Sequence, residues 1–398
     1  MKILFITPSV PDELSRIRSL NHLKALSADH EIVLLSFIKN ENRKEKLVPL
    51  HKYLYDSYTF LLPAWKSWVN CAIALFSRIP LRVAYYYSQD FTHFLLELLK
   101  NQHFDCVIVK RKRLAQYGIY LEKIPNILDL TDATALHYER AKGKGRGLEF
   151  LINYEEFPKI KRYEVEAIKK FDLTAVCSRN DKEYLEKISQ EALPRIVVVP
   201  NVVDTEYYAP DKSLEKNNII LFTGVMKALV NQEAILEFYK LVWNDILKQF
   251  PDTQLRIAGP EPPPQIRKLH DNRNVFVTGY VDDLRQEINK ATIVISPVNV
   301  AAGTRNKILQ AMSMQKAVIS TKIGAEGLDN LDENNIMLAE NIMEFGNFIK
   351  SCLRNKEKRE IMGQKAREFV MKNYSIDILR KTLNSSIAIA LKNHKERC

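Results

Sequence analysis

The chain has 398 residues, 46% of them hydrophobic, which is enough apolar material for the cores of two or three domains and argues against disorder. A formal net charge of +11 favours anionic partners such as nucleic acid, anionic lipid or phosphate-bearing small molecules. The five cysteines form no CxxC pair, which argues against a disulfide framework or zinc site and for a reducing compartment, the cytoplasm. We expect neither a secretory signal nor a spanning helix, because no uninterrupted apolar run reaches about 18 residues.

The first residues have the pattern of a parallel α/β sheet. An apolar run at 2–6 is followed by a segment at 17–26 whose Ile and Leu residues share one helical face, and then by a second apolar run at 31–37. Strand, helix, strand is the repeating unit of such a sheet. Further strands are predicted at 106–109, 126–129, 173–177 and 196–199.

The same alternation is clearer in the second half of the chain. Strands are predicted at 219–223, 255–258, 275–278, 293–296 and 317–320. Helices are predicted near 231–247, 283–290, 304–314, 342–354, 356–373 and 376–393. Several of these strands stop at Gly or Pro, where the chain turns toward a helix.

A polar segment without apolar periodicity, 211–218, separates the two halves. It predicts two doubly wound, Rossmann-like domains. The N-terminal domain comprises 1–205 and is completed by the last helix, 376–398, and the C-terminal domain comprises 206–375. Two such sheets leave a cleft at the carboxyl ends of their strands, where ligands bind.

The strongest local signal lies at 295–312, where a strand ends, a loop of small residues follows and a helix begins near Thr304. The free N–H groups and the dipole of a helix start favour an anion. Gly303 allows close backbone approach, and Arg305 and Lys307 add positive charge. An ordinary strand-to-helix turn with a solvated Arg and Lys accounts for this segment equally well.

The segment GTRNKILQAMSMQKAVISTKIGAEGLD, at 303–329, resembles the signature of the GT-B nucleotide-sugar glycosyltransferases of family 4 type, the glycosyl transferases group 1. Four shorter segments agree with that family in order and spacing, at 199–204, 222–226, 257–260 and 277–283. The resemblance covers nearly the whole chain. Its nearest subgroup is the sugar transferases associated with exosortase systems and exopolysaccharide synthesis, on the residues at 11–12, 17–19, 224–226 and 231.

The resemblance implies a bacterial, cytoplasmic, metal-independent enzyme that needs no cofactor and retains the anomeric configuration. It would move a sugar from a UDP- or GDP-sugar to a glycan, lipid-linked or protein acceptor. Ala302 and Gln310 replace the two glutamates usual in the family, and Leu14 stands near a usual glycine. These departures leave open a second interpretation, a non-catalytic subunit of a glycosylation complex. Nucleic-acid binding has no supporting motif.

The resemblance also indicates which residues bind the donor. They are Gly224, Lys227, Val281, Gly303, Thr304, Arg305, Lys307 and Gln310. Lys227 and Arg305 would act in catalysis, because positive charge stabilises the departing diphosphate. Gln310 would bond the ribose hydroxyls through its amide. Lys227 as a solvated lysine and Gln310 as a helix-surface residue are the plain alternatives.

The N-terminal domain is expected to carry the acceptor, with Pro11, Arg16, Thr131, Asp132 and His137 on that side. Asp132 would be catalytic, orienting an acceptor hydroxyl or the donor sugar. In the plainer reading, the neighbouring Asp129 caps or braces the turn, and His137 is a surface or packing residue.

An aromatic, amphipathic stretch contains Trp65, Trp68 and Phe76 together with Lys66 and Arg78. It suits either peripheral contact with a membrane that carries a lipid-linked acceptor or a core helix. Basic clusters at 110–113, 142–146 and 159–170 would fit the anionic inner face of a cell membrane, although most such runs are merely solvated.

Overall fold

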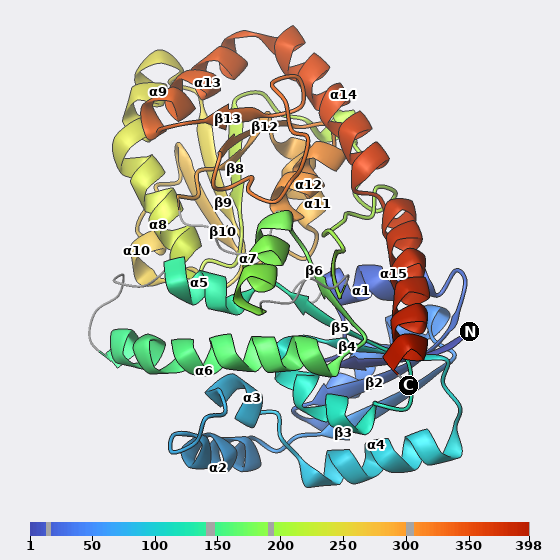
Figure 1. Cartoon of the computed structure of the whole chain (residues 1–398). Coiled ribbons are helices and arrows are strands. Elements are labelled where there is room, and N and C mark those ends of the chain that lie inside the picture. Colours follow the sequence, from blue (N-terminus) through green and yellow to red (C-terminus); the bar gives the residue numbers. More distant parts are fainter. Residues whose placement is uncertain (13–16, 141–147, 190–194, 300–305, 398) are drawn as a thin grey trace. The chain divides into compact units, whose positions relative to one another are not determined.

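The computed structural model describes residues 1–12, 17–140, 148–189, 195–299 and 306–397. The chain divides into two compact units (Figure 1). Unit 1 comprises Met1–Pro200 and Leu379–Cys398, and unit 2 comprises Asn201–Ile378. From the sequence, the two boundaries were placed after residue 205 and before residue 376.

Unit 1 contains a seven-stranded sheet in which every neighbouring pair is parallel. Its strands are β1 (Lys2–Thr7), β2 (Glu31–Ile38), β3 (Asp56–Leu61), β4 (Cys106–Lys110), β5 (Asn126–Thr131), β6 (Leu173–Val176) and β7 (Ile196–Val198). The spatial order is β3-β2-β1-β4-β5-β6-β7, so the direction of winding reverses between β1 and β4. Ligands bind beyond the carboxyl ends of strands at such a switch point.

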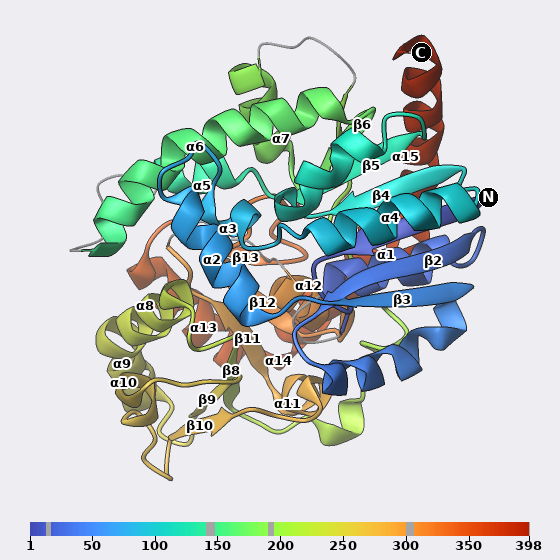
Figure 2. The ribbon, with the colours of Figure 1, turned by 90° about the horizontal axis from the view of Figure 1, so that it is seen from below.

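The helical segments of unit 1 are α1 (Ile17–Leu26), η1 (Glu41–Tyr53), α2 (Ala64–Ala74), α3 (Leu81–Ala84), α4 (Gln89–Asn101), η2 (Lys112–Tyr120), α5 (Thr134–Arg140), α6 (Leu148–Lys170) and α7 (Arg179–Ser189). Leu4 and Val33, on one face of the sheet, belong to the same apolar core as Phe91 of α4 and Ile168 of α6. Figure 2 shows α4 lying along the strands of this sheet. Burial of these side chains is the main force that holds the helices on the sheet.

The last helix, α15 (Ile376–Arg397), returns to unit 1 after the chain has completed unit 2. Arg380 Nε donates to Asp29 Oδ2 over 2.6 Å, and His394 Nδ1 lies 2.9 Å from Asp172 Oδ2. These contacts join the end of the chain to two acidic residues of the N-terminal segment.

Unit 2 contains a six-stranded parallel sheet of order β10-β9-β8-β11-β12-β13. Its strands are β8 (Ile219–Thr223), β9 (Gln254–Ala258), β10 (Val275–Gly279), β11 (Ile293–Ser296), β12 (Ala317–Thr321) and β13 (Met337–Ala339). Its helical segments are η3 (Lys212–Leu214), α8 (Leu229–Phe238), η4 (Tyr239–Trp243), α9 (Asn244–Gln249), α10 (Pro264–Arg267), α11 (Leu284–Lys290), α12 (Asn306–Ser313), α13 (Ile342–Arg354) and α14 (Lys356–Asn373).

The prediction of two Rossmann-like parallel sheets is confirmed, but two strands were missed. The edge strand β3 is only partly buried and mixes polar with apolar residues, and β13 has three residues, too few for a pattern. The helix predicted at 304–314 is described from Asn306 to Ser313.

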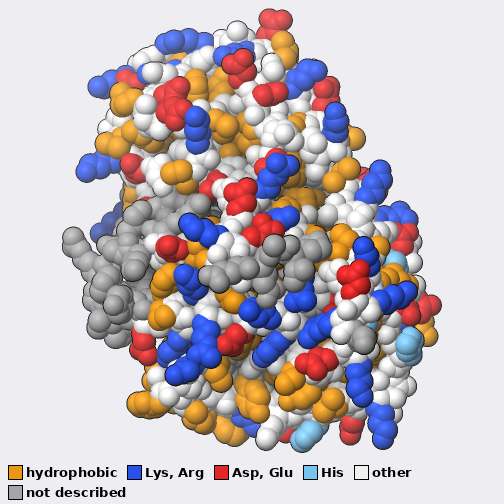
Figure 3. All heavy atoms as spheres, viewed as in Figure 1, with side chains coloured by type: hydrophobic (Ala, Val, Ile, Leu, Met, Phe, Trp, Pro, Cys, Tyr) orange, Lys and Arg blue, Asp and Glu red, His pale blue; other side chains and the backbone are white. Residues whose placement is uncertain are grey.

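The aromatic stretch forms α2 and the loop after it, and it is not a core helix. Trp65, Trp68 and Phe76 are 65%, 68% and 96% exposed. Figure 3 shows hydrophobic side chains on the surface where α2 lies. Among the described helices, none is both long enough and apolar enough to cross a bilayer.

Candidate functional site

In unit 2, the first candidate feature is a pair of glycines at the carboxyl ends of β8 and β9. Gly224 N–H donates to the carbonyl of Ala258 over 3.1 Å. A Cβ on Gly259 would lie 1.7 Å from the carbonyl oxygen of Gly224, and a Cβ on Gly224 would lie 2.7 Å from Asn231 Nδ2. Only glycine fits at either place, so the backbone turns in direct contact at this edge of the sheet.

Lys307 lies at the same edge. Its Nζ donates to Asn231 Oδ1 over 3.0 Å and stands 4.6 Å from the centre of the Phe222 ring. Burial lowers the pKa of Lys307 to about 8. No carboxylate in the described part of the chain pairs with its amine. An anion that entered would therefore meet a cation already held in place by Asn231.

Gln310, one turn further along α12, is buried, so it is not the helix-surface residue of the plain alternative. Its Nε2 donates to the hydroxyl of Tyr208 over 2.8 Å, and Ser313 Oγ donates to the Tyr208 carbonyl over 2.8 Å. Tyr208, near the start of unit 2, thereby holds the Gln310 amide in place.

The other predicted donor residues differ in their surroundings. Lys227 is exposed, and its carbonyl accepts from Gln232 Nε2 over 3.0 Å. Val281 is half-buried in the turn before α11, where Asp283 caps the helix by accepting from the N–H of Arg285 over 2.9 Å. The predicted residues Gly303, Thr304 and Arg305, together with Ala302, lie outside the described residues.

In unit 1, a buried carboxylate, Asp129, organises the carboxyl end of β5. Arg18 of α1 donates to it from Nε over 3.1 Å and from Nη2 over 3.2 Å, and Lys110 at the end of β4 bonds the same group. Burial alone would raise the pKa of Asp129, but the charges of Arg18 and Lys110 hold it well below its usual value. Asp129 is therefore an ionised brace of the strand end.

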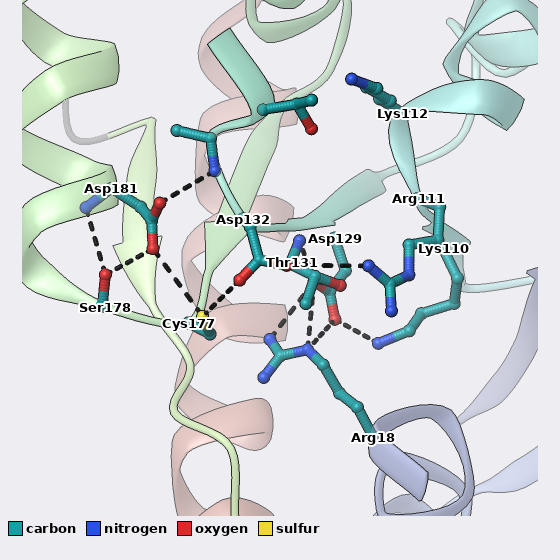
Figure 4. Close-up of polar contacts among 12 residues, drawn as sticks. Arg18, Lys110, Arg111, Lys112, Asp129, Thr131, Asp132, Cys177, Ser178 and Asp181 are labelled. Carbon is teal, nitrogen blue, oxygen red and sulfur yellow. Dashed lines mark hydrogen bonds and ion pairs between the residues drawn. The ribbon is translucent and has the colours of Figure 1, made fainter. Parts of the chain in front are cut away.

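That brace shapes the turn that presents Asp132 (Figure 4). Thr131 has a φ of 73°, and its N–H donates to Asp129 Oδ1 over 2.9 Å. A threonine in the left-handed region is strained, and such strain concentrates at functional turns. The reading in which Asp129 braces the turn agrees with this geometry.

Asp132 itself is 19% exposed and lies between a donor and a cation. Cys177, which follows β6, lies with its Sγ 3.1 Å from Asp132 Oδ1, and Arg111 Nη1 lies 3.8 Å from Oδ2. Burial, and then the charge of Asp132, raises the pKa of Cys177 well above its usual value. The sulfur is therefore a protonated donor to the carboxylate.

Asp132, Cys177 and Asp181 are the one set of three metal-ligand atoms within 4.8 Å of one another that the described residues contain. In this structure the Cys177 thiol instead donates to Asp132 Oδ1 over 3.1 Å. The Asp181 carboxylate is also occupied, since it accepts from Ala133 N over 3.0 Å and from the Ser178 hydroxyl. The three groups form a hydrogen-bond network that ties α7 to the Asp132 turn.

Of the remaining acceptor-side predictions, the structure describes Pro11 and His137. Pro11 is buried beyond β1, and Arg16 and Leu14 lie outside the described residues. His137 belongs to α5. The start of α5 is held by Glu164 of α6, whose oxygens accept from the N–H groups of Thr134 over 2.8 Å and Ala135 over 3.0 Å.

The sequence suggested no role for Glu164 or Cys177. It placed Lys110 in a basic cluster suited to a membrane surface, whereas the Lys110 side chain is buried against Asp129. Arg18 and Asp129 are 111 residues apart, and nothing local pairs them. The available signal was position alone. Lys110 ends β4, Cys177 directly follows β6, and Asp129 stands two residues before the end of β5.

Each unit also contains a cavity. The cavity of unit 1, about 210 Å³, lies beyond the carboxyl ends of β1, β2 and β3. The cavity of unit 2, about 250 Å³, is lined by Thr292 and Lys316, which precede β11 and β12. The second cavity is thus at the amino edge of its sheet, away from Lys307, and is no candidate for the predicted donor.

A model of a known protein family matches most of unit 2. Residues 217–355 match the family model described as glycosyl transferases group 1. An uncharacterised 44.6 kDa protein in the cps region of Klebsiella pneumoniae is 26% identical over 172 residues, which are 41% of this chain and 44% of that protein. The match therefore spans less than half the length of that curated relative.

Solved structures resemble the chain over almost its entire length. HepE of Anabaena in complex with UDP and glucose has a TM-score of 0.69 at 15% identity, covering 98% of this chain and 99% of that one. TarM has a TM-score of 0.69 at 12% identity, covering 97% and 98%. Sucrose-phosphate synthase of Thermosynechococcus elongatus has a TM-score of 0.67 at 14% identity, covering 97% and 98%. The chain therefore has the GT-B fold, and its residues 217–355 match the model of the glycosyl transferases group 1.

Proposed function

We propose that the chain is a retaining, metal-independent glycosyltransferase that moves a sugar from a UDP- or GDP-sugar to a glycan, lipid-linked or protein acceptor. The observation that carries the proposal is Lys307, a cation without a carboxylate partner among the described residues, held by Asn231 beside the Gly224 turn. This group lies inside the region that matches the family model. Further support comes from HepE of Anabaena, whose structures contain UDP or UDP-glucose.

In this proposal, unit 2 binds the donor. Lys307, Arg305 and Lys227 would neutralise the diphosphate, and Gly303 and Thr304 would complete the donor site. Positive charge placed there stabilises the charge that builds on the leaving nucleotide, which is the main electrostatic task of the reaction. Gln310 and Val281 would border the ribose and the base.

Unit 1 would bind the acceptor. Asp132 is a partly exposed carboxylate on a strained, braced turn, as expected of a group that orients an acceptor hydroxyl or the donor sugar. Thr131, Pro11, Arg16 and His137 would complete this side. A role in cell-surface polysaccharide synthesis is supported by the cps-region relative.

A second candidate function is a non-catalytic subunit that keeps the fold. It is favoured by the replacement of both family glutamates, at Ala302 and Gln310. It is also favoured by the hydrogen bond that the Gln310 amide already makes to Tyr208. Transfer of sugar, or hydrolysis of the donor, separates the two candidates.

The decisive experiment is a thermal-shift panel of UDP- and GDP-sugars on the full chain, followed by a hydrolysis assay with whichever sugar nucleotide stabilises it. A ligand at 100 times its Kd stabilises a protein by about 2.7 kcal/mol, which such a scan detects. If a sugar nucleotide stabilises the protein and is slowly hydrolysed by it, the glycosyltransferase proposal is supported. Stabilisation without any turnover supports the non-catalytic subunit, and a panel with no shift rejects donor binding.

For its location we propose peripheral contact with the inner face of the cell membrane through α2 and the loop after it. The exposed Trp65, Trp68 and Phe76 are suited to a bilayer interface. No Asp or Glu stands between Asp56 and Asp90. Lys66 is paired with Asp90 over 2.8 Å, so the exposed Arg78 is the cation of this stretch that would complement anionic lipid.

A further inference from the structure

The cavity of unit 1 is built where the sheet changes its direction of winding. Its lining includes residues within three positions of the ends of four adjacent strands. These are Ser9 after β1, Lys39 after β2, Leu62 after β3 and Arg113 after β4. The cavity thus spans the switch point between β1 and β4, the place where doubly wound sheets bind ligands.

The charges around this cavity are unbalanced. Among the described residues, its lining holds three cations, Lys39, Lys46 and Arg113, and one carboxylate, Asp12. Lys46 Nζ donates to Asp12 Oδ2 over 2.9 Å, which neutralises one pair. Neither Lys39 nor Arg113 has a carboxylate within ion-pair distance in the described part of the chain.

Aromatic rings hold these two cations instead. The Arg113 guanidinium stands 5.2 Å from the centre of the Tyr86 ring, and its Nη1 lies 3.4 Å from the Tyr86 hydroxyl. Lys39 Nζ stands 5.9 Å from the centre of the Tyr85 ring. A ring positions a cation without cancelling its charge, so both remain available to an anion.

The size of the cavity limits what it can hold. Its 210 Å³ is below the roughly 300–1,000 Å³ of pockets for drug-sized ligands, so it fits one small group. Polar groups at its wall, such as the side chains of Ser9 and Tyr86, suit a ligand that also forms hydrogen bonds.

We propose that this cavity receives the anionic group of the acceptor, a phosphate or a carboxylate, and that Arg113 and Lys39 recognise it. The inference rests on the proposed function, since it names the chemical class of the acceptor. A phosphate would come from a lipid carrier and a carboxylate from an acidic sugar.

The cavity adjoins the exposed apolar surface of α2. The Tyr85 ring that holds Lys39 also makes an edge contact with the Trp68 ring, with 6.3 Å between the centroids. Leu62 in the cavity wall is separated from the start of α2 by Pro63 alone. An anion joined to an alkyl chain can therefore reach the cavity while its chain lies along α2.

The test is isothermal titration calorimetry on the full chain with three probes below their micelle concentrations. They are octyl phosphate, octyl β-D-glucuronide and the neutral octyl β-D-glucoside. We expect at least one anionic probe to bind at least about tenfold more tightly than the glucoside. The better of the two identifies the source of the anion, and equal binding of all three overturns the proposal.

Two variants and a matched control locate the binding. Arg113→Gln and Lys39→Gln should each raise the Kd of the preferred anionic probe by about tenfold, or 1.4 kcal/mol. Lys100→Gln, the same charge change at an exposed position of α4, should leave it unchanged. Because Lys39 is exposed, its variant tests the site even if Arg113→Gln unfolds. The proposed site is wrong if Lys100→Gln weakens binding of the probe as much as the two variants do, or if Lys39→Gln does not weaken it.

UDP titration of the same variants separates this inference from the proposed function. We expect unchanged UDP affinity, because Lys39 and Arg113 belong to unit 1. If the anionic probes bind but no nucleotide sugar does, the transferase proposal fails and the anion site stands. If nucleotide sugars bind and turn over while the anionic probes do not bind, the site alone is rejected.

Discussion

The thiol of Cys177 lies 3.1 Å from the carboxylate of Asp132 and donates to it. Burial and the neighbouring charge keep the pKa of this thiol well above its usual value, so the donor persists throughout the neutral range. With Arg111 near the second oxygen, the contact fixes the direction of a carboxylate that is still partly open to solvent. The next two predictions follow from this arrangement.

Asp132→Asn should lower kcat by at least about 100-fold, because a positioned carboxylate of this kind contributes roughly 10²–10⁴-fold. The Kd of UDP should not change, since Asp132 belongs to unit 1. Steady-state kinetics and calorimetry measure the two quantities. If the variant keeps nearly the full kcat, Asp132 has no catalytic role.

Cys177→Ser retains a donor and should keep kcat within about threefold, whereas Cys177→Ala should lower kcat by about tenfold, the value of one hydrogen bond to a charged group. Cys71→Ala, at a half-buried cysteine of α2, serves as the control. Equal kcat for the serine and alanine variants, with equal unfolding midpoints, would contradict a positioning role for the thiol.

The Kd of UDP should depend on pH through Lys307. The pKa of this lysine is lowered to about 8, so it is charged at pH 7 and mostly neutral at pH 9. Only the charged form attracts a diphosphate, and the Kd should therefore rise about tenfold between these values. Lys307→Arg keeps its charge and should give a flat profile in the same titrations. Parallel profiles for the two proteins would show that another group titrates.

Gly259→Ala should destabilise unit 2 by about 3 kcal/mol or more, because the new methyl group would collide with the Gly224 carbonyl and the two strand ends would have to separate. Gly279→Ala is the matched control. The new methyl group of Gly279→Ala would have no atom within 4 Å. Only the φ of 69° would then lower the free energy of unfolding, by about 1–2 kcal/mol. Urea unfolding compares the two, and an equal loss would contradict the steric argument.

Membrane contact through α2 can be followed by intrinsic fluorescence. Of the three tryptophans, Trp243 is buried and Trp65 and Trp68 are exposed, so Trp243→Phe leaves a protein whose emission reports on α2. We expect its emission to shift to the blue with vesicles containing phosphatidylglycerol and to shift less with phosphatidylcholine alone.

Adding Phe76→Asp to this protein should weaken vesicle binding by at least about tenfold, whereas Met343→Asp, at an exposed residue of unit 2, should not. If neither kind of vesicle shifts the emission, the proposal that α2 and the loop after it contact the membrane is rejected.

The sequence predicted the fold well because parallel strands buried on both faces are nearly continuous apolar runs. Strands such as Ile219–Thr223 and Ile293–Ser296 stop at glycine or proline, which made them easy to recognise. The edge strand Asp56–Leu61 lacks that signal, because it is only partly buried.

The site was harder to predict, since its contacts join residues that are distant in the chain. Lys307 and Asn231 are 76 residues apart, and Cys177 and Asp132 are 45 apart. Composition also left the aromatic stretch at α2 open between a core helix and a surface helix. That choice depends on which neighbours cover it, which only the folded chain reveals.

Helix α15 has a consequence for how the protein is made. The residues that bond Asp29 and Asp172 are near the end of the chain, so a nascent N-terminal sheet must await the synthesis of all of unit 2 before its last helix can dock. Premature termination shortly before Leu379 would therefore harm the unit translated first, leaving unit 2 nearly whole.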